Sequence, residues 1–326
     1  MSHWLDLLPV GEEMDQFERD VEAMRRDQRQ SHRAQALESA LDVQVPYRNQ
    51  LEQYGFVPAN HEKPNWFPVD AGRVYDAKGN EIPGYLRVFR EDTGDVLAVH
   101  SDSYTVISYR DVFDMFDAAL ADSDLDTEGM MVGTDMTHNG ARCFRQYVLP
   151  RHQIDLGNGD RHALRIIGFN SYDGSMAASL MAGGYRFTCA NMSVIGRHLV
   201  QLKVRHAGKS TGVRLEDGIG RVVEAADHFV RMEPRYRRWK EVPVVVEGFK
   251  DLVGGLPQIT ERLTDHLVAK FATEKEEGTL YGAWNILTNW ATHADTKAHK
   301  AQTTIDRQKR VATLIDGRAW KVLEDA

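Results

Sequence analysis

The sequence predicts an α+β fold, with an antiparallel hairpin-rich sheet, a capping helix and a helical C-terminal region. Three turn pairs, Asn139-Gly140, Asn158-Gly159 and Asp173-Gly174, separate strand-like runs in succession. Asn-Gly and Asp-Gly favour the positive backbone angles of tight hairpins, so these runs predict an antiparallel meander. Beyond Gly218 the apolar spacing changes to a helical period. A doubly wound fold is therefore not expected.

The chain divides into three segments on these patterns. Residues 1–70 predict an N-terminal helical arm, over 11–42, followed by a Pro-rich extended connector from residue 45. Residues 71–215 predict the antiparallel core, and residues 216–326 predict the helical region. Strands are expected at 73–76, 84–90, 96–100, 129–136, 141–149, 152–156, 162–169 and 175–189.

Helix boundaries follow from capping and proline signals. Ser108-Tyr-Arg-Asp111 has the spacing of a capping box, so a helix is expected to begin there. Glu233-Pro234 is expected to kink or end the first C-terminal helix, because proline removes a backbone donor. The C-terminal helices are expected at 218–240, 257–276, 279–293 and 299–315. Trp239, Trp284 and Trp290 can pack this region against the sheet.

The composition is that of a globular protein. Of the 326 residues, 42% are hydrophobic, and no apolar run approaches the roughly 20 residues that span a bilayer. The first residues lack the basic and apolar regions of a secretory signal, so a cytoplasmic location without membrane partners is expected. The two cysteines, Cys143 and Cys189, are too few for a disulfide scaffold and are expected to be buried.

Charge is distributed unevenly along the chain, whose net charge is −8. Residues 91–135 hold twelve acids and one basic residue, whereas residues 138–215 hold eleven basic residues and three acids. From Phe187 to Leu215 there is no acid at all. Such asymmetry indicates either a polyanion site or acidic and basic faces that join subunits. Mutual neutralisation within one fold is the alternative.

Four ordered motifs carry a family resemblance. They are Thr93–Phe113, Asn170–Ser175, Arg186–Asn191 and Val204–Gly208. The chain resembles the phage- and plasmid-borne proteins grouped as domain of unknown function 932, over roughly residues 85–235. The family pattern more often has His at Tyr172 and Val at Phe187, which disfavours residue 172 as a metal ligand or proton shuttle. The resemblance implies a mobile element in a bacterial host cell and a part in DNA replication, recombination or protection.

The basic segment is the expected binding site. Basic side chains contact phosphates while aromatic rings stack on bases of any sequence. We therefore expect single-stranded DNA to bind without bond cleavage, in a homo-oligomer whose acidic surface at 108–128 meets the basic surface at 186–214 of the next protomer. The residues expected at this site are Tyr185, Arg186, Arg197, Lys203, Arg205, His206 and Lys209. A second basic set comprises Lys297, Lys300, Arg307, Lys309 and Arg310.

Four residues of the motifs are expected to be structural. Asp173 and Gly174 form a turn, and the amides of Asn170 and Asn191 are expected to tie two strand ends together. No catalytic residue, metal or cofactor is expected, because the sequence has no phosphate-binding glycine loop, metal helix or nucleophile elbow. Two alternatives stay open. One is an enzyme acting on nucleic acids or nucleotides through Asp173, His206 and Asn191, and the other is a structural or host-interaction protein.

Overall fold

The structure is a computed structural model that describes residues 44–194, 215–256, 259–273, 278–295 and 300–325. It contains two compact units, residues 1–49 and 50–326. The arm predicted at 11–42 lies outside the described residues. Helix α2 (Gln44–Gln53) occupies the start of the predicted connector, so that prediction is wrong up to Gln53. Pro46 falls in the first turn of α2, where the missing amide hydrogen has no helical partner to lose.

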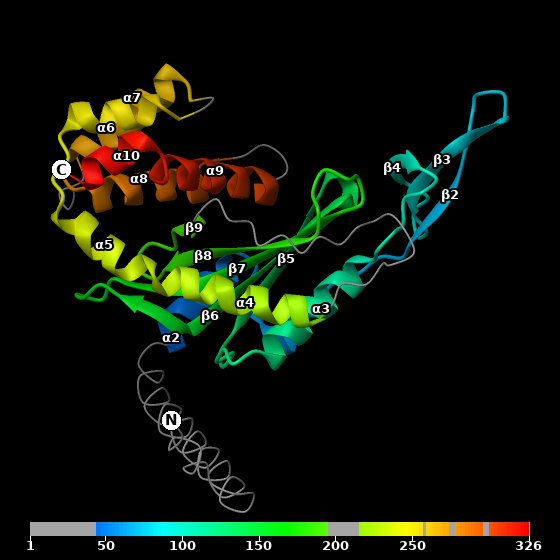
Figure 1. The fold of residues 1–326 in the computed structure, drawn as a ribbon, viewed down its shortest axis with the longest axis horizontal. Coiled ribbons are helices and arrows are strands. Elements are labelled where there is room, and N and C mark those ends of the chain that lie inside the picture. Colours follow the sequence, from blue (N-terminus) through cyan, green and yellow to red (C-terminus); the bar gives the residue numbers. More distant parts are fainter. Residues whose placement is uncertain (1–43, 195–214, 257–258, 274–277, 296–299, 326) are drawn as a thin grey trace, which may run out of the picture. The chain divides into compact units, whose positions relative to one another are not determined.

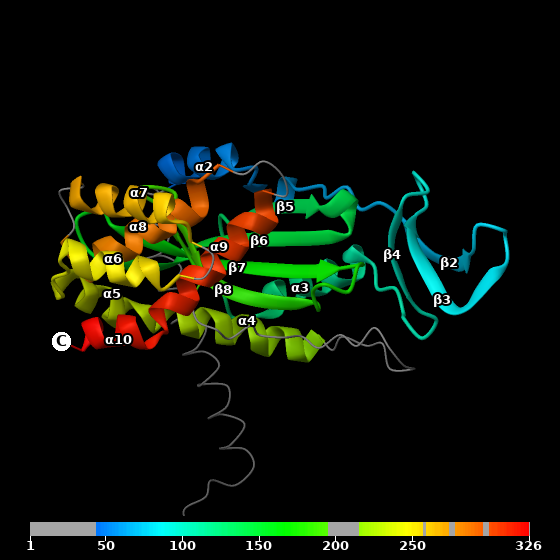
Figure 2. The ribbon, with the colours of Figure 1, turned by 90° about the horizontal axis from the view of Figure 1, so that it is seen from above.

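The main sheet of the second unit has six antiparallel strands. In chain order they are β1 (Val57–Pro58), β5 (Met131–Thr137), β6 (Arg142–Asp155), β7 (Arg161–Ser171), β8 (Ser179–Arg186) and β9 (Met192–Val194). Their order in space is also their order in the chain, so the predicted meander is confirmed. Figure 2 shows β5 to β8 side by side. The turn residues Asn139, Asn158 and Gly174 have the positive φ angles that the hairpin prediction requires.

Seven helices lie in the described C-terminal part. They are α4 (Leu215–Val230), α5 (Met232–Glu241), α6 (Val246–Gly254), α7 (Glu261–Thr273), α8 (Leu280–His293), α9 (Lys300–Ile315) and α10 (Arg318–Glu324). The first predicted helix does break near Glu233-Pro234, because α4 ends at Val230 and α5 begins at Met232. The short helices α6 and α10 were not predicted. The fold class, a hairpin-rich sheet followed by helices, is confirmed.

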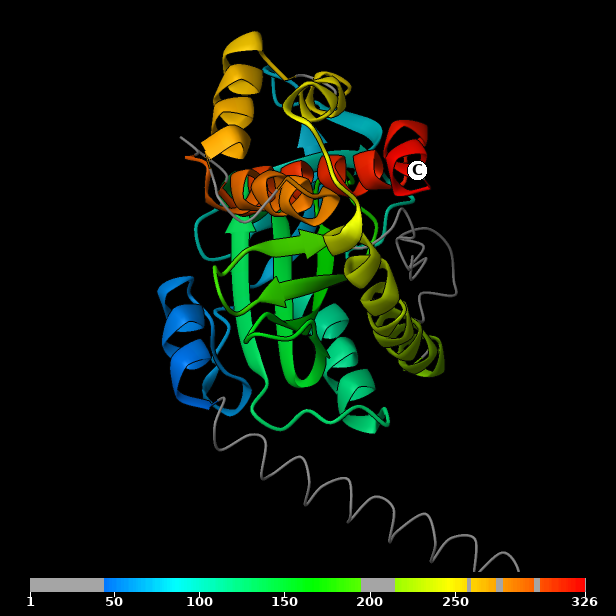
Figure 3. The same cartoon turned by 90° about the vertical axis from the view of Figure 1, so that its left-hand side faces the viewer.

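Helices cover both faces of the main sheet (Figures 1 and 3). Ile167 of β7 packs in a cluster with Ile305 of α9. Its neighbour Ile166 points to the opposite face and joins a cluster with Phe116 of α3 (Tyr109–Asp122) and Phe229 of α4. Both faces are therefore buried, so residues that point to either face contribute to the core.

A smaller sheet precedes α3 in the chain. It contains β2 (Val69–Tyr75), β3 (Glu81–Arg90) and β4 (Val96–Ser101), paired antiparallel in that order. Val88 of β3 is fully buried, whereas Tyr85 and Val99 on the other face are more than half exposed. Helix α3 then begins as predicted, because the Ser108 hydroxyl accepts a hydrogen bond from the amide of Asp111 at 3.0 Å.

Aromatic residues join the C-terminal helices to the sheet. Trp284 of α8 lies 5.7 Å from the ring of His162 on β7, measured between centroids. Trp239 of α5 packs on Trp284 at 6.0 Å and on Trp320 of α10 at 5.1 Å. The predicted packing of Trp239 and Trp284 against the sheet is therefore confirmed, and this region is one continuous core with the strands.

Candidate functional site

Five of the seven residues expected to bind nucleic acid lie outside the described residues. They are Arg197, Lys203, Arg205, His206 and Lys209. The structure describes the two ends between which they lie, β9 ending at Val194 and α4 beginning at Leu215. The attachment of this basic segment to the fold is therefore known.

Tyr185 does not offer a face for base stacking. Its side chain is fully buried, its ring packs edge-on against Phe187 at 5.7 Å, and its hydroxyl donates to Gln50 Oε1 at 3.2 Å. The expectation that this ring stacks on a base is wrong because the ring belongs to the core. Tyr185 and Phe187 do share one side of the strand, as the two-residue period requires.

Arg186 is also occupied within the fold. Its side chain is 13% exposed, and its Nε donates to Asp160 Oδ1 at 2.7 Å. The guanidinium also lies over the ring of Tyr281, 5.4 Å from the centroid. A charge held in this way is not available as a simple phosphate contact, so the expectation for Arg186 is corrected.

Asp160 is the centre of a buried polar cluster that joins β7 and β8 to α5 and α8. Besides Arg186, Lys240 Nζ lies 3.0 Å from its Oδ2, and the Tyr281 hydroxyl donates to the same oxygen at 2.8 Å. The Tyr281 hydroxyl uses its one hydrogen in this bond to Asp160. Its oxygen can therefore only accept from His162, whose Nε2 donates to it at 2.8 Å. The sequence suggested none of these contacts, since Asp160 only looked like the last residue of a turn.

The charge state of this cluster follows from its surroundings. Burial alone would raise the pKa of Asp160, but hydrogen bonds from His162 and Arg186 outweigh burial and hold that pKa well below its usual range. Burial lowers the pKa of His162, whose ring is therefore neutral at pH 7. One carboxylate thus faces two basic side chains, Arg186 and Lys240.

We expect the protein to lose stability as the pH falls from 7.5 to 5.5. Burial lowers the pKa of His162, and it does the same for His152 and His293. The unfolded chain therefore takes up protons near pH 6.5 that the folded protein does not, and the free energy of unfolding decreases below that pH. Each unit by which a pKa differs between the folded and the unfolded state changes the free energy of unfolding by about 1.4 kcal/mol.

Thermal unfolding across this pH range measures the effect. The His162→Gln variant should show a flatter dependence of Tm on pH, whereas His61→Gln, which changes an exposed ring, should keep the slope of the parent. A parent protein whose Tm stays constant between pH 7.5 and 5.5 would contradict this account.

A second polar cluster surrounds Asn191, just after β8. The carbonyl of its side chain accepts from His293 Nε2 at 3.1 Å and from Asn289 Nδ2 at 3.1 Å, and its amide donates to the Asn285 carbonyl at 3.3 Å. All three partners lie on α8. Ala190, which precedes Asn191, has a positive φ of 53°, a conformation that residues other than glycine seldom adopt. Asn191 therefore fixes an unusual turn onto α8.

Cys189 lies between the two clusters. Arg186 Nη1 lies 3.6 Å from its sulfur, and His293 Nε2 lies 3.2 Å from its carbonyl oxygen. Its side chain is half-buried, whereas Cys143 is fully buried, and burial raises the pKa of the Cys143 thiol. The expectation that both cysteines are buried thus holds for Cys143 and only in part for Cys189.

The motif at 170–175 joins three elements. The Tyr172 hydroxyl accepts a hydrogen bond from the Tyr109 amide at 3.0 Å, at the start of α3, and the Tyr172 carbonyl accepts one from His100 of β4 at 2.7 Å. Asp173 accepts from the Ser175 amide at 2.9 Å and pairs with Arg142 at 2.7 Å. The expected turn at Asp173 and Gly174 is confirmed, and its side chains hold the smaller sheet and α3 to the main sheet.

Asn170 does not pair with Asn191. Its side chain is fully buried, and neither its amide nitrogen nor its oxygen has a hydrogen-bond partner. Asn191 bonds to α8 instead, so the expected tie between the two amides is wrong. Strand β8 explains the separation, because Asn170 precedes this strand of eight residues and Asn191 follows it.

The same separation argues against the enzyme alternative. Asp173 precedes β8 and Asn191 follows it, so roughly 25 Å of extended chain lies between them at about 3.3 Å per residue. The hydrogen bonds of Asp173 go to Arg142 and Ser175, whereas those of Asn191 go to α8. The grouping of these two residues in one catalytic site is therefore wrong. The third member, His206, lies outside the described residues.

The face of the sheet under α9 carries a buried cation that the sequence did not single out. Arg165 of β7 is 1% exposed, and it donates to Gln146 Oε1, to Gln308 Oε1 at 2.8 Å and to the Ser193 carbonyl at 3.4 Å. These partners, two glutamine side chains and a backbone carbonyl of the described residues, are all uncharged. Burial lowers its pKa to about 9, so the guanidinium stays charged at neutral pH.

Basic residues of α9 lie near this position. Lys300 is exposed, and Arg307, Lys309 and Arg310 are partly exposed. Lys309 lies 4.8 Å from the ring centroid of Phe169, and burial lowers the pKa of its amine. Four members of the second basic set are thus placed on one helix, while Lys297 lies outside the described residues.

The acidic and basic blocks of the sequence pair partly with each other. Arg145 Nη2 lies 2.8 Å from Asp117 Oδ2, and Arg151 Nη2 lies 2.6 Å from Glu128 Oε2. Both acids belong to the acidic block and both arginines to the basic block. Part of the charge asymmetry is therefore neutralised inside the fold.

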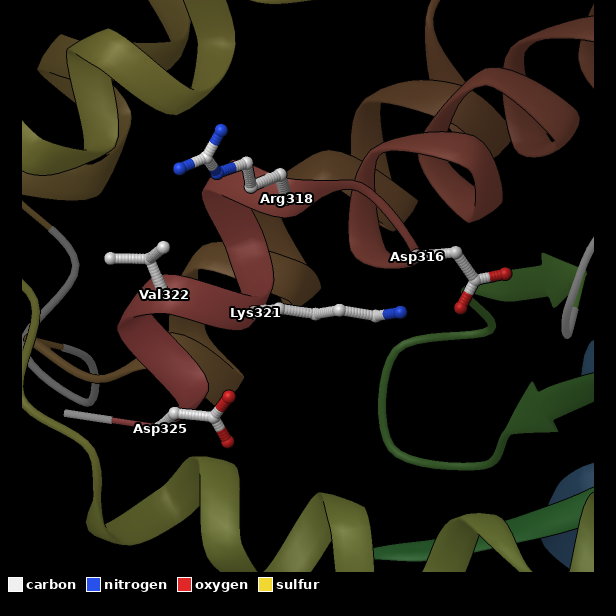
Figure 4. A pocket seen from close by; sticks show the side chains of 5 residues that line it. All are labelled: Asp316, Arg318, Lys321, Val322 and Asp325. Carbon is white, nitrogen blue, oxygen red and sulfur yellow. The ribbon is translucent and has the colours of Figure 1, made fainter.

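A shallow pocket of ≈ 500 Å³ lies at the turn between α9 and α10. Figure 4 shows Lys321 extending from α10 toward Asp316. Arg235 of α5 pairs with Asp316 at 3.4 Å and with Glu324 at 2.8 Å. These charges fix α10 onto α5, so we assign the pocket a structural role. Its lining residues are Asp316, Arg318, Lys321, Val322 and Asp325.

Neither a metal site nor a membrane span is found among the described residues. They contain no group of three or more His, Cys, Asp or Glu side chains that could hold a metal ion. No helix in the described ranges is both long and apolar enough to cross a bilayer.

Comparisons with known proteins identify one family model. It is described as a domain of unknown function (DUF932) and matches residues 96–312, which include α3, most of the main sheet and the helices up to α9. No curated protein and no solved structure gives a significant match. The match begins in β4 and ends within α9, so it includes both polar clusters and the basic segment between β9 and α4.

Proposed function

The chain belongs to the DUF932 family, and we propose that it binds single-stranded DNA as part of a phage or plasmid DNA transaction in the bacterial cytoplasm. Binding serves replication, recombination or annealing and involves no bond cleavage. The observation that carries this proposal is the run from Phe187 to Leu215, which contains no acid. Its basic residues after β9 are Arg197, Lys203, Arg205, Lys209 and Arg214.

The attachment points of the basic segment support this proposal. Val194, the last residue of β9, packs in one cluster with Ala301 and Ile305 of α9. The basic segment therefore leaves the sheet beside the helix that carries Arg307 and Lys309. Two basic sets that are distant in sequence begin at neighbouring points of the fold, and together they provide more phosphate contacts than either set alone.

Arg165 adds to the field on the same face. A buried charge is screened less by salt than an exposed one, and no acid lies in the segment that follows Ser193, whose carbonyl accepts from Arg165. A positive potential on this face would favour a polyanion. Electrostatic capture is the first step of the proposed mechanism, and ordering of the strand along neighbouring subunits is the second.

We propose that subunits assemble through the acidic surface of α3. Asp111, Asp114 and Asp122 are exposed on this helix, and they can face the basic segment of the next protomer. Arg186 takes no part in this contact because Asp160 holds it.

A salt series with a fluorescent oligothymidylate tests the binding proposal. Replacing the five basic residues after β9 with glutamine should weaken binding strongly at 50 mM salt. The slope of log K against log salt should also become shallower, by roughly 0.7 for each phosphate of the single strand that the variant no longer neutralises.

A matched variant controls for the loss of five positive charges. Its replaced residues are exposed and lie on other parts of the surface, namely Lys78, Arg231, Lys250, Arg262 and Arg318. This control should bind nearly as well as the parent. Absence of salt-sensitive binding by the intact protein would remove the proposal, as would an equal decrease in affinity in the two variants.

A further inference from the structure

The guanidinium of Arg165 is buried between the main sheet and α9, which crosses this face of the sheet (Figure 2). Ile167, two positions farther along β7, points to the same face. It packs there in an apolar cluster with Val194 and Ile305. The hydrogen-bond partners of Arg165 are uncharged. A positive charge that is removed from water without a counter-ion destabilises the folded state, so this site lacks a negative charge.

The hydrogen bonds of Arg165 leave one of its donors unused. A guanidinium has five hydrogens that it can donate. Nε and Nη2 both donate to Gln146 Oε1, and Nη1 donates to Gln308 Oε1 at 2.8 Å and to the Ser193 carbonyl at 3.4 Å. These four bonds leave the second hydrogen of Nη2 without an acceptor among the described residues.

A second unused donor lies on a side chain that contacts Arg165. Gln308 of α9 is 1% exposed, and its Nε2 has no hydrogen-bond partner within the described residues. The two ends of this carboxamide cannot be exchanged, because its oxygen accepts from Arg165 and a guanidinium offers the nitrogen no acceptor. The two unused donors therefore belong to groups that are hydrogen-bonded to each other, so they are close neighbours.

An anion suits this place better than a water molecule. Buried water commonly satisfies orphan donors and occupies about 30 Å³, but it leaves the charge of Arg165 uncompensated. Chloride is little larger than water, accepts hydrogen bonds from both donors and neutralises the guanidinium. The segment that follows Ser193 cannot supply the missing charge, since it contains no acid as far as Leu215.

We propose that Arg165 and Gln308 form a buried binding site for a small monovalent anion of the size of chloride. The anion accepts one hydrogen bond from Arg165 Nη2 and one from Gln308 Nε2, and it is the counter-ion of the guanidinium. Because it binds only the folded chain, it stabilises the packing of α9 on β7. The site does not depend on the proposed DNA binding. When it is occupied, the charge of Arg165 no longer adds to the field of this face.

Urea denaturation of the full-length protein at constant ionic strength tests for the anion. Sodium chloride replaces sodium methanesulfonate stepwise, and the methanesulfonate anion is too large for a void that holds one water molecule. Above the dissociation constant, each tenfold increase in chloride should raise the folding equilibrium constant about tenfold. Bromide should act like chloride, and its anomalous scattering in a crystal should give a peak beside Arg165 Nη2 and Gln308 Nε2.

Gln308→Glu supplies the missing negative charge from within the protein. Its carboxylate takes the place of the oxygen that accepts from Arg165 at 2.8 Å. Without chloride, its folding equilibrium constant should therefore exceed that of the parent about tenfold, and added chloride should not increase it further. Arg165→Met should lose the chloride dependence as well. Gln53→Glu, the same change at an exposed position of α2, should keep the chloride dependence of the parent.

The comparison of the parent with Gln308→Glu decides the proposal, because general effects of salt act on both proteins alike. Circular dichroism confirms that each variant is folded. A parent protein that gains no more stability from chloride than Gln308→Glu does overturns the proposal. If that variant is nevertheless more stable than the parent, the two donors bind a water molecule instead. Bromide peaks that occur only at other positions also overturn it.

Discussion

Asp160→Ala is expected to destabilise the protein by about 3–5 kcal/mol, because it leaves the largely buried guanidinium of Arg186 without its counter-ion. Arg186 Nε and Lys240 Nζ lie 2.7 and 3.0 Å from the Asp160 carboxylate, which is almost completely enclosed. The Tyr281 hydroxyl would also lose its acceptor. Chemical denaturation followed by circular dichroism measures the change in the free energy of unfolding.

Two companion variants sharpen this experiment. Asp155→Ala changes an exposed acid of the same hairpin, which accepts one hydrogen bond from the Gly157 amide at 2.8 Å. Its effect should be about 1 kcal/mol. Asp160→Asn keeps the shape but removes the charge, so it should be nearly as harmful as Asp160→Ala. Equal, small effects of Asp160→Ala and Asp155→Ala would show that the cluster is not a stabilising centre.

The pH dependence of the parent should agree with this role. The pKa of Asp160 is lower in the folded protein than in the unfolded chain, where it is about 3.9. Asp160 therefore contributes to the free energy of unfolding above about pH 3.9, and this contribution is lost as the pH falls toward the folded pKa. Acid unfolding of the parent should therefore steepen below about pH 4. In Asp160→Asn that part of the transition should be absent.

Gly183→Ala is expected to cost about 3 kcal/mol, because β9 approaches β8 too closely for a side chain at this position. A Cβ on Gly183 would lie 2.1 Å from the backbone oxygen of Ser193. Either β9 or β8 must move. Arg165 then loses its hydrogen bond to the Ser193 carbonyl, which is 3.4 Å long. Thermal unfolding should show a large decrease in Tm.

A second glycine provides the control. Gly220 lies in α4, and a Cβ there would meet nothing within 4 Å. Gly220→Ala should therefore stabilise the protein by roughly 0.5–1 kcal/mol through its higher helix propensity. If Gly183→Ala were as stable as the parent, the close pairing of β8 with β9 would be wrong.

The sheet could be predicted from the sequence because its information is local. Each of the three hairpins from β5 to β8 is encoded by two residues with a known backbone preference, and Asn139, Asn158 and Gly174 all have positive φ angles in the structure. The turn between β8 and β9 was not predicted, because residues 175–189 were expected to form one strand. Ser108 marked the start of α3 for the same reason. Helix α6 was missed because it is short and lies between two longer helices that dominate the apolar pattern.

The polar clusters could not be predicted because their partners are distant in the chain. Asp160 and Tyr281, which are hydrogen-bonded, are 121 positions apart in the sequence, and Asn191 and Asn289 are 98 positions apart. No spacing rule connects such residues before the fold is known. Tyr185 and Arg186 illustrate the reverse error, since an exposed role was inferred from their type while their strand is buried on both faces.

Charge distribution along the chain was informative only in part. The pairing of Arg145 with Asp117 and of Arg151 with Glu128 uses opposite blocks of the sequence. Counting charges by segment cannot reveal such pairs, because it ignores how hairpins bring segments together. The positive charge of the segment after β9 is not neutralised within that segment, because it contains no acids.

The hydrogen bonds of Tyr172 to α3 and β4 have a consequence for the order of folding. The hairpin of β2 and β3 is local, but the smaller sheet docks through His100 on Tyr172, 72 positions away, and through Asp95 on Asn139, 44 positions away. Contacts of long sequence separation require closure of large loops and so form slowly. We therefore expect residues 69–101 to dock late, once Tyr172 and Asn139 are in place, and a chain that ends before Tyr172 should expose this sheet without that support.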